Sequence, residues 1–143
     1  MKAPEGLRPL VLVVDDSYDI LDMYRYYLEH AAGMDVVVSE SAEGALDCVS
    51  NGRPRPAAIV MDLMMPGIGG IEGIRRLKAD PSMRPIPIIV LTANHSASTK
   101  AAAVDACCDR FLLKPVFPEK LVDEIRGVLD SPRREPVPRG RLR

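Results

Sequence analysis

The sequence has little cysteine, no long hydrophobic run and almost no excess charge, and each of these absences excludes a class of protein. Its 143 residues include three cysteines, Cys48, Cys107 and Cys108, an odd number without the spacing of disulfide pairs or metal ligands. A small domain held together by disulfides is therefore excluded, and a reducing compartment, the cytoplasm, is expected. The net charge of −1 does not favour a chain built throughout to bind nucleic acid.

The hydrophobic runs are too short to suggest a membrane protein. No uninterrupted apolar run approaches the roughly 18 to 20 residues that cross a bilayer. The first run, residues 10–14, stops at two aspartates before it reaches the length of the apolar segment of a signal peptide. We therefore expect neither a signal peptide nor insertion into a membrane.

The composition is otherwise that of a globular domain, with 47% hydrophobic and 27% charged residues. Charge is uneven along the chain: five arginines and one glutamate give residues 131–143 a charge of +4, which leaves −5 for the first 130 residues. Because its charges and prolines cannot form a buried face, that segment is expected to be a basic, flexible tail. We predict a disordered segment at residues 1–9 and one folded domain at residues 10–130.

Short apolar runs alternate with longer amphipathic stretches throughout residues 10–130. The runs span residues 10–14, 36–38, 57–61, 86–91 and 111–113, and they are continuous, as expected of strands that are buried on both faces. Apolar residues recur at helical spacing between the runs and after the last of them. Five strands that alternate with five helices predict a doubly wound α/β domain with a five-stranded parallel sheet.

Polar side chains stand at the ends of four of the five predicted strands. They are Asp15 and Asp16 after the first strand, Asp62 at the third, Thr92 at the fourth and Lys114 after the fifth. Ligands of doubly wound sheets bind beyond the carboxyl ends of the strands. We therefore expect these five side chains to converge on one edge of the sheet.

The chemistry of this set indicates phosphoryl transfer. Three crowded carboxylates repel one another and need a cation, and ligands that are all oxygens suit Mg²⁺, with Mn²⁺ as an alternative. The ammonium of Lys114 and the hydroxyl of Thr92 complete the groups that stabilise a phosphoryl group in transit. Asp62, which stands alone beside a flexible turn, is the best candidate for a nucleophile that forms an aspartyl-phosphate.

Four segments together resemble the receiver domains of two-component response regulators. They are Asp15-Asp16, residues 60–67 (VMDLMMPG), residues 91–93 (LTA) and residues 111–115 (FLLKP), and the resemblance covers about residues 10–130. It implies the flavodoxin-like (βα)5 fold with strand order 2-1-3-4-5. It also implies a single-domain phosphoacceptor that receives a phosphoryl group on Asp62 from a histidine kinase or a histidine phosphotransfer protein. Such a domain is not a conventional enzyme, although it catalyses its own phosphorylation and slow dephosphorylation.

The same resemblance implies a set of metal ligands. Asp16 and Asp62 would bind Mg²⁺ through their carboxylates, and Met64 would bind it through its backbone carbonyl. Asp15 would act mainly through a bound water.

It also implies how the phosphoryl group is held. Lys114 would contact the phosphoryl oxygens, Thr92 would hydrogen-bond them, and the peptide bond between Lys114 and Pro115 would be cis. Met64 and Asn94, two residues after Asp62 and Thr92 respectively, would tune the lifetime of the acyl-phosphate.

A switch follows from the added charge. A phosphoryl group brings about −1.5 to −2 charges, which would draw Thr92 towards them. The aromatic residue that fills the vacated space in the family corresponds to Phe111, and the alternative is that Phe111 is a permanently buried core ring. The fourth helix, predicted at residues 98–106, would form the output face with the fifth strand and fifth helix. That face would bind a downstream protein or a second copy of the chain.

Some positions depart from the family pattern or leave two interpretations open. Cys107-Cys108 stand where the family commonly has Gly-Ala, and we expect small buried residues rather than a redox switch. Phe117 is either an exposed contact or packs on the edge of the sheet. Tyr26 either docks the phosphoryl donor or covers the margin of the sheet.

Three other functions remain as alternatives. The first is that the chain is a receiver detached from a longer regulator, with its basic tail as the linker. The second is that it is a Mg²⁺-dependent phosphohydrolase with an aspartate nucleophile. Such hydrolases carry a second acid two residues after the nucleophile, where this chain has Met64, which weakens the second alternative. The third is that the tail binds nucleic acid or an anionic membrane.

Overall fold

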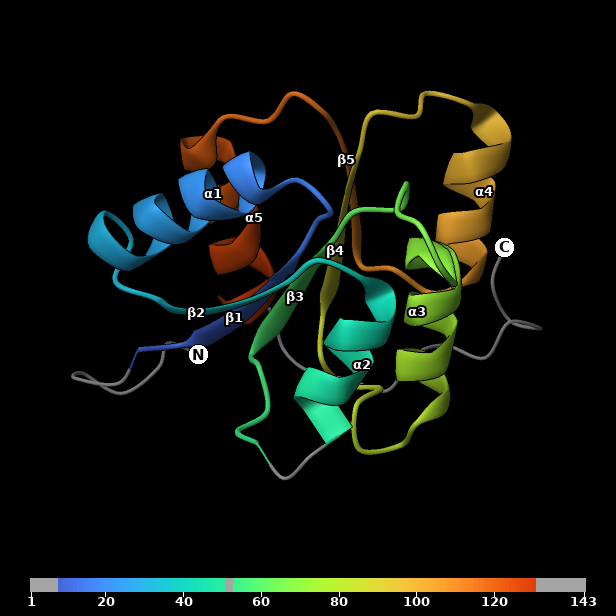
Figure 1. The fold of residues 1–143 in the computed structure, drawn as a ribbon, viewed down its shortest axis with the longest axis horizontal. Helices are drawn as coiled ribbons and strands as arrows, with labels where there is room; N and C mark the ends of the chain where they lie inside the picture. The colour runs from blue at the N-terminus through green and yellow to red at the C-terminus, as the bar shows by residue number, and fades with distance from the viewer. Residues whose placement is uncertain (1–7, 51–52, 131–143) are drawn as a thin grey trace.

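The computed structural model describes residues 8–50 and 53–130, in which five strands alternate with five helices (Figure 1). In chain order the elements are β1 (Leu10–Val14), α1 (Tyr18–His30), β2 (Asp35–Ser39), α2 (Ala42–Ser50), β3 (Ala58–Met61), α3 (Gly69–Ala79), β4 (Ile88–Thr92), α4 (Ala97–Asp105), β5 (Arg110–Leu113) and α5 (Pro118–Asp130). Each predicted strand is present, with ends that differ by at most two residues. None of the helices in the described ranges is long and apolar enough to cross a membrane.

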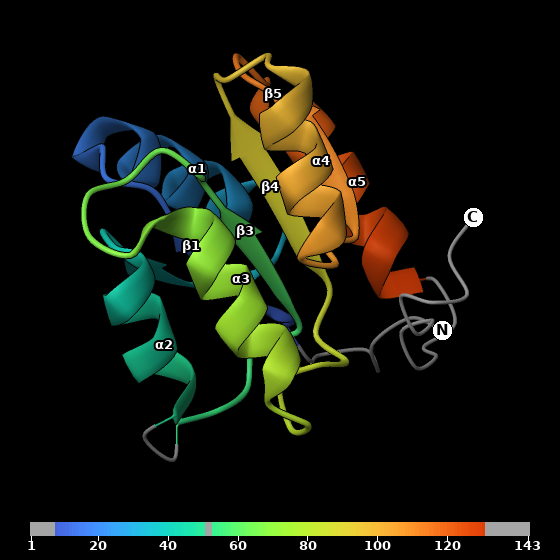
Figure 2. The same cartoon turned by 90° about the vertical axis from the view of Figure 1, so that its right-hand side faces the viewer.

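The strands form one parallel sheet in the order β2-β1-β3-β4-β5, which confirms the predicted flavodoxin-like topology. α1 and α5 cover one face, and α2, α3 and α4 cover the other, as Figures 1 and 2 show from two directions. The strand order reverses between β1 and β3, which are direct neighbours. Ligand sites of doubly wound sheets lie at such a reversal, beyond the carboxyl ends of the strands.

The sheet separates two hydrophobic cores, and this explains why the strand sequences are continuously apolar. Alternate side chains of β1 point to opposite faces, so Leu12 and Val14 join the core under α2, α3 and α4, while Val11 and Val13 join the core under α1 and α5. Burial of each such side chain stabilises the fold by about 1.5–3 kcal/mol relative to exposure. The two cores therefore hold the strand ends, and the polar residues after them, in a fixed arrangement.

Side-chain hydrogen bonds fix where α2 and α4 begin. Ser41 Oγ accepts the N–H of Gly44 at 3.0 Å at the start of α2, and Ser96 Oγ accepts the N–H of Thr99 at 3.1 Å at the start of α4. At α3 the constraint is steric: a Cβ atom on Gly70 would collide with the carbonyl oxygen of Asp62. Only glycine lets α3 start against the end of β3.

The described part of the chain begins at residue 8, two residues before the first residue of the predicted domain. Arg8 Nε lies 2.9 Å from Asp35 Oδ1, and the carbonyl of Pro9 accepts the N–H of Asp35 at 2.9 Å. Residues 8 and 9 thus extend the first strand's contacts with β2. The rest of the predicted amino-terminal segment, residues 1–7, and the predicted tail, residues 131–143, lie outside the described residues.

Candidate functional site

The five polar residues predicted at the strand ends lie together at one edge of the sheet. Parallel pairing places Val14 beside Met61 and Thr92 beside Leu113, so the residues that follow these strands meet. Asp15 and Asp16 follow β1, and Asp62 follows β3. Thr92 is the last residue of β4, and Lys114 follows β5. The chain brings these groups together from positions up to 99 residues apart.

Three carboxylates form the acidic part of the site. Oxygens of Asp15, Asp16 and Asp62 all lie within 4.8 Å of one another. Asp15 is 2% exposed and Asp62 is 4% exposed, whereas Asp16 lies open to solvent. Two shielded anions beside a third are electrostatically costly without a cation. The donor set consists of hard oxygens with one side open, and it therefore fits a divalent ion that keeps several of its waters, as Mg²⁺ does.

Lys114 supplies the positive charge of the site. Its Nζ lies 2.7 Å from Asp15 Oδ2 and 3.5 Å from Asp62 Oδ2. Burial lowers the pKa of the Lys114 ammonium, but the hydrogen bond to Asp15 and the charges of both aspartates outweigh burial, so that the pKa lies above its usual value. Lys114 is therefore a permanent cation, and Asp15 is its nearest partner.

The Asp62 carboxylate is held on both of its oxygens. Oδ1 accepts the backbone N–H of Met64 at 3.2 Å, and Oδ2 faces Lys114. Burial raises the pKa of the Asp62 carboxyl above its usual value, while the Met64 N–H and the Lys114 ammonium oppose the rise. A carboxylate that is shielded from bulk water yet fixed by two donors is well placed to act as a nucleophile.

Thr92 and the chain after β5 close the other side of the site. Thr92 is fully buried, its Oγ1 accepts the N–H of Asn94 at 3.3 Å, and its carbonyl accepts the N–H of Lys114 at 2.8 Å. The peptide bond between Lys114 and Pro115 is cis, as the resemblance implied. The backbone hydrogen bond between β4 and the end of β5 therefore holds Thr92 beside Lys114.

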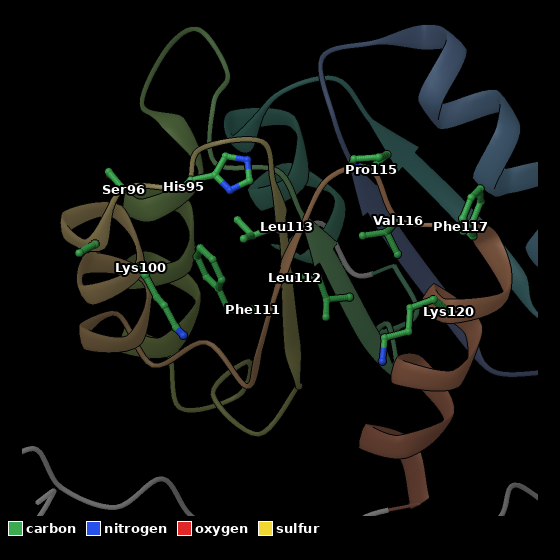
Figure 3. Close-up of a pocket in the computed structure, with 11 residues that line it drawn as sticks. His95, Ser96, Lys100, Phe111, Leu112, Leu113, Pro115, Val116, Phe117 and Lys120 are labelled. Atoms are coloured by element: carbon green, nitrogen blue, oxygen red, sulfur yellow. The ribbon is translucent and has the colours of Figure 1, made fainter.

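Phe111 is half-buried and packs against the core on the face of the sheet that α2, α3 and α4 cover. Its ring lines a cavity of about 690 Å³ over β5, between the amino-terminal halves of α4 and α5, and Lys100 Nζ lies 6.0 Å from the ring centroid. Figure 3 shows Phe111 beside Lys100 of α4, with Phe117 and Lys120 across the cavity. The ring therefore borders open space, because β5 is the edge strand and α4 does not cover it completely.

Met64 and Asn94 lie beside each other at the edge of the site. Asn94 Nδ2 lies 3.9 Å from Met64 Sδ, and the Met64 side chain is 57% exposed. Two elements that meet only in the folded chain thus place both predicted tuning residues together. Their effect on the lifetime of an acyl-phosphate stays a prediction.

The backbone before β5 explains why glycine is common in the family where this chain has Cys107. Cys107 has a φ angle of 77°, in the left-handed region that favours glycine, and the family commonly has glycine at that position. Cys107 and Cys108 are both half-buried, so the expected burial is only partial. Burial raises the pKa of the Cys108 thiol to about 11, which keeps it protonated at neutral pH.

Two aromatic positions with open interpretations lie on the surface. Phe117 is exposed rather than packed on the edge of the sheet, and it lines the cavity over β5. Tyr26 is exposed on α1, its ring 4.5 Å from that of His30, while Tyr24 is buried and donates its hydroxyl to the carbonyl of Val116 at 2.7 Å. The exposure of Tyr26 is compatible with docking, which stays a prediction.

Sequence reasoning missed two acidic residues next to the site. The hydroxyl of Tyr18, at the start of α1, donates to the carboxylate of Glu40, and Glu43 at the start of α2 accepts the N–H of Ile68 from the β3–α3 loop. Glu40 directly follows β2, so the rule that found the other residues at strand ends would also have found it. The contact of Glu43 has no comparable signal, because it depends on how α2 packs beside the loop.

Comparisons with known proteins agree with this geometry. The family model described as the response regulator receiver domain matches residues 11–126. The response regulator MprA of Mycobacterium sp. strain KMS is 37% identical over 119 residues, which are 83% of this chain and 50% of that protein. The phosphate regulon transcriptional regulatory protein PhoB of Pseudomonas aeruginosa is 35% identical over the same length, with 51% of that protein covered. The chain spans about half the length of the curated relatives it matches.

Solved structures give the same result. A putative response regulator from Chloroflexus aurantiacus has a TM-score of 0.80 at 30% identity, covering 87% of this chain and all of that one. Chemotaxis protein CheY4 of Vibrio cholerae has a TM-score of 0.79 at 28% identity, covering 85% of this chain and 99% of that one. The family match covers most of the chain. The protein therefore belongs to the response regulator receiver family, the phosphoacceptor signalling domains of two-component systems.

Proposed function

We propose that Asp62 is the phosphoacceptor and that its donor is a phosphohistidine on a histidine kinase or a histidine phosphotransfer protein. An Asp62 oxygen forms the new bond to phosphorus as the bond from phosphorus to the histidine nitrogen breaks, and the product is an acyl-phosphate. The observation that carries the proposal is the position of Lys114 Nζ, between the carboxylates of Asp15 and Asp62. A buried acid next to a fixed ammonium is suited to receive a group whose oxygens are negative.

The reaction requires a divalent cation, Mg²⁺ or in its place Mn²⁺. Asp16 and Asp62 would hold it through their carboxylates, Met64 would hold it through its backbone carbonyl, and Asp15 would contribute through a bound water. The metal supplies charge neutralisation at the phosphoryl oxygens. The cluster of three acids within 4.8 Å supports this assignment, since a single lysine leaves the cluster with excess negative charge.

Lys114 and Thr92 stabilise the transferred group and transmit its presence. Lys114 leaves Asp15 to contact the phosphoryl oxygens, and the Thr92 hydroxyl turns towards them. Phe111 then moves into the space that Thr92 vacates. The cavity beside the half-buried Phe111 ring supports this movement, because it leaves the ring room to exist in two positions.

The output surface comprises α4, β5 and α5. The cavity over β5 is lined by apolar side chains together with His95, Ser96, Lys100 and Lys120, and no acidic residue contributes to its lining. A downstream protein or a second copy of this chain binds there when Asp62 is phosphorylated. The exposed rings and lysines of Figure 3 support this use of the surface.

The domain acts in the cytoplasm, either alone or as the receiver of a longer regulator. The chain spans about half of each of these curated relatives, which is the part that holds their receiver. The hydrolase alternative loses support, because the residue two positions after Asp62 is the exposed Met64 rather than an acid. In this proposal residues 10–130, which the family resemblance covers, are the receiver, and residues 131–143 are the linker or tail.

The test uses a small-molecule phosphoryl donor. Incubation with acetyl phosphate and Mg²⁺ is expected to add one phosphate per chain, detected by intact-mass spectrometry, and beryllofluoride is expected to shift backbone NMR signals of α4, β5 and α5. Asp62→Asn is expected to lose both responses. Asp19→Asn, the same change at an exposed residue of α1, is the matched control and is expected to keep them. Equal labelling of wild type and Asp62→Asn would identify a different acceptor. Continuous release of phosphate with no retained label would favour the hydrolase.

A further inference from the structure

The β3–α3 loop, residues 62–68, carries both the proposed phosphoacceptor and the proposed backbone ligand of the metal. The loop is fixed at its two ends. The N–H of Met64 donates to Asp62 at the start, and the N–H of Gly70 donates to the carbonyl of Leu63 at 3.2 Å at the end. Leu63 and Met65 are buried, whereas Pro66 and Gly67 are exposed. The turn at residues 66–68 is therefore held neither by these two hydrogen bonds nor by burial of its side chains in the core.

Glu43, in the first turn of α2, provides that contact. Its Oε2 accepts the N–H of Ile68 at 3.2 Å. The same carboxylate lies against Gly67: a Cβ atom there would be 2.8 Å from Oε1 and would overlap Oε2. Gly67 also has a φ of +87°, so glycine both permits the turn and leaves the space that the carboxylate occupies.

We propose that Glu43 is a positioning residue, which through Gly67 and Ile68 holds the β3–α3 loop in the conformation that binds the divalent cation. The inference rests on the proposed metal site at Asp16, Asp62 and the Met64 carbonyl. Glu43 has no place among those ligands. It fixes the loop that carries two of them, and residues behind the ligands of a metal commonly set its affinity in this way.

The first experiment separates the loop from the metal. Amide hydrogen exchange in the metal-free protein reports the Ile68 N–H directly. Glu43→Ala is expected to speed exchange at Ile68 by at least about tenfold, whereas Glu43→Gln keeps an acceptor oxygen and is expected to stay near wild type. Asp47→Ala, on the exposed side of the same helix, is the matched control. Unchanged exchange in Glu43→Ala would overturn the proposal.

The second experiment measures Mg²⁺ binding by calorimetry in the same variants. Glu43→Ala is expected to raise the dissociation constant about tenfold, and Glu43→Gln and Asp47→Ala are expected to change it by less than about twofold. Faster exchange at Ile68 with unchanged Mg²⁺ affinity would also overturn the proposal. A wild-type protein that binds no Mg²⁺ would contradict the proposed function instead, whatever Glu43 does to the loop.

A double-mutant cycle tests whether Gly67 and Glu43 act through the same contact. Gly67→Ala displaces the carboxylate, so it is expected to speed Ile68 exchange and weaken Mg²⁺ binding much as Glu43→Ala does. In the Glu43→Ala background the carboxylate is already absent, so the same change adds mainly the strain of its φ angle. The two effects should therefore be clearly non-additive. Additive effects would show that Gly67 and Glu43 act independently, against the proposal.

Discussion

Lys114 Nζ lies 0.8 Å closer to Asp15 Oδ2 than to Asp62 Oδ2, with separations of 2.7 Å and 3.5 Å. In this structure Lys114 thus pairs mainly with Asp15, the acid for which the resemblance implied a role through a bound water. This pairing neutralises one buried carboxylate and leaves Asp62 the less strongly paired of the two. It also predicts how the two residues contribute to stability.

Lys114→Met is expected to lower the free energy of unfolding by about 1–3 kcal/mol, because it leaves the buried Asp15 carboxylate without its cation. Asp15→Asn in the same chain is expected to recover most of that loss, since the asparagine keeps the oxygen that accepts the Ser17 N–H. Urea denaturation in EDTA at pH 7 measures both. Additive costs in the double variant would show that the pair is not coupled.

Gly70→Ala is expected to destabilise the protein by about 1–3 kcal/mol, because its Cβ would meet the backbone of Asp62 and Leu63, which cannot move aside as a flexible side chain can. Gly127→Ala is the matched control. A Cβ at Gly127, within α5, has no atom within 4 Å, so this substitution is expected to stabilise by about 0.5–1 kcal/mol. Urea denaturation measures both variants. Equal effects would refute the close packing of α3 against β3.

Cys107→Gly is expected to stabilise the protein, because glycine adopts the φ of 77° without the cost of about 1–2 kcal/mol that a Cβ incurs there. The greater freedom of glycine in the unfolded chain offsets part of this gain and leaves about 0.5–1 kcal/mol. Cys107→Val, with a β-branched side chain, is expected to be destabilised. Thermal unfolding of the three proteins should rank them glycine, cysteine, valine, and a reversed order would contradict the backbone conformation.

Cys108 predicts a dependence of stability on alkaline pH. Burial raises the pKa of its thiol to about 11, from 9.0 in the unfolded chain. Above pH 9 the unfolded state therefore loses this proton more readily than the folded state, and stability falls between about pH 9 and pH 11. Cys108→Ala removes this contribution, so wild type should lose stability relative to the variant across that range. A constant difference between them would contradict the raised pKa.

The positions of the proposed site residues could be predicted because they depend only on topology. Once the apolar runs are assigned to parallel strands, the residues after the runs must share an edge, and this places Asp62 and Lys114 together although 52 residues separate them. Strand order required the resemblance, since alternation of strands and helices is compatible with several orders. The fold and the membership of the site were therefore within reach of sequence patterns.

Contacts between individual side chains could not be predicted in the same way. The direct pairing of Lys114 with Asp15 depends on which rotamer the lysine adopts over the sheet edge. The contact of Glu43 with Ile68 depends on how far α2 lies from a loop that follows a different strand. The half-burial of Phe111 depends on how completely α4 covers β5, which the sequence of a short alanine-rich helix leaves open.

The long separation between the acids and their lysine has a consequence for the protein as it is being made. A ribosome adds Asp15, Asp16 and Asp62 first, and Lys114 joins the chain only 52 residues after Asp62. Until β5 joins the sheet, the nascent polypeptide carries three mutually repelling anions without their counterion. Under the proposed function, a prematurely terminated product that lacks β5 would be unable to answer the kinase, so half-made molecules would transmit no false signal.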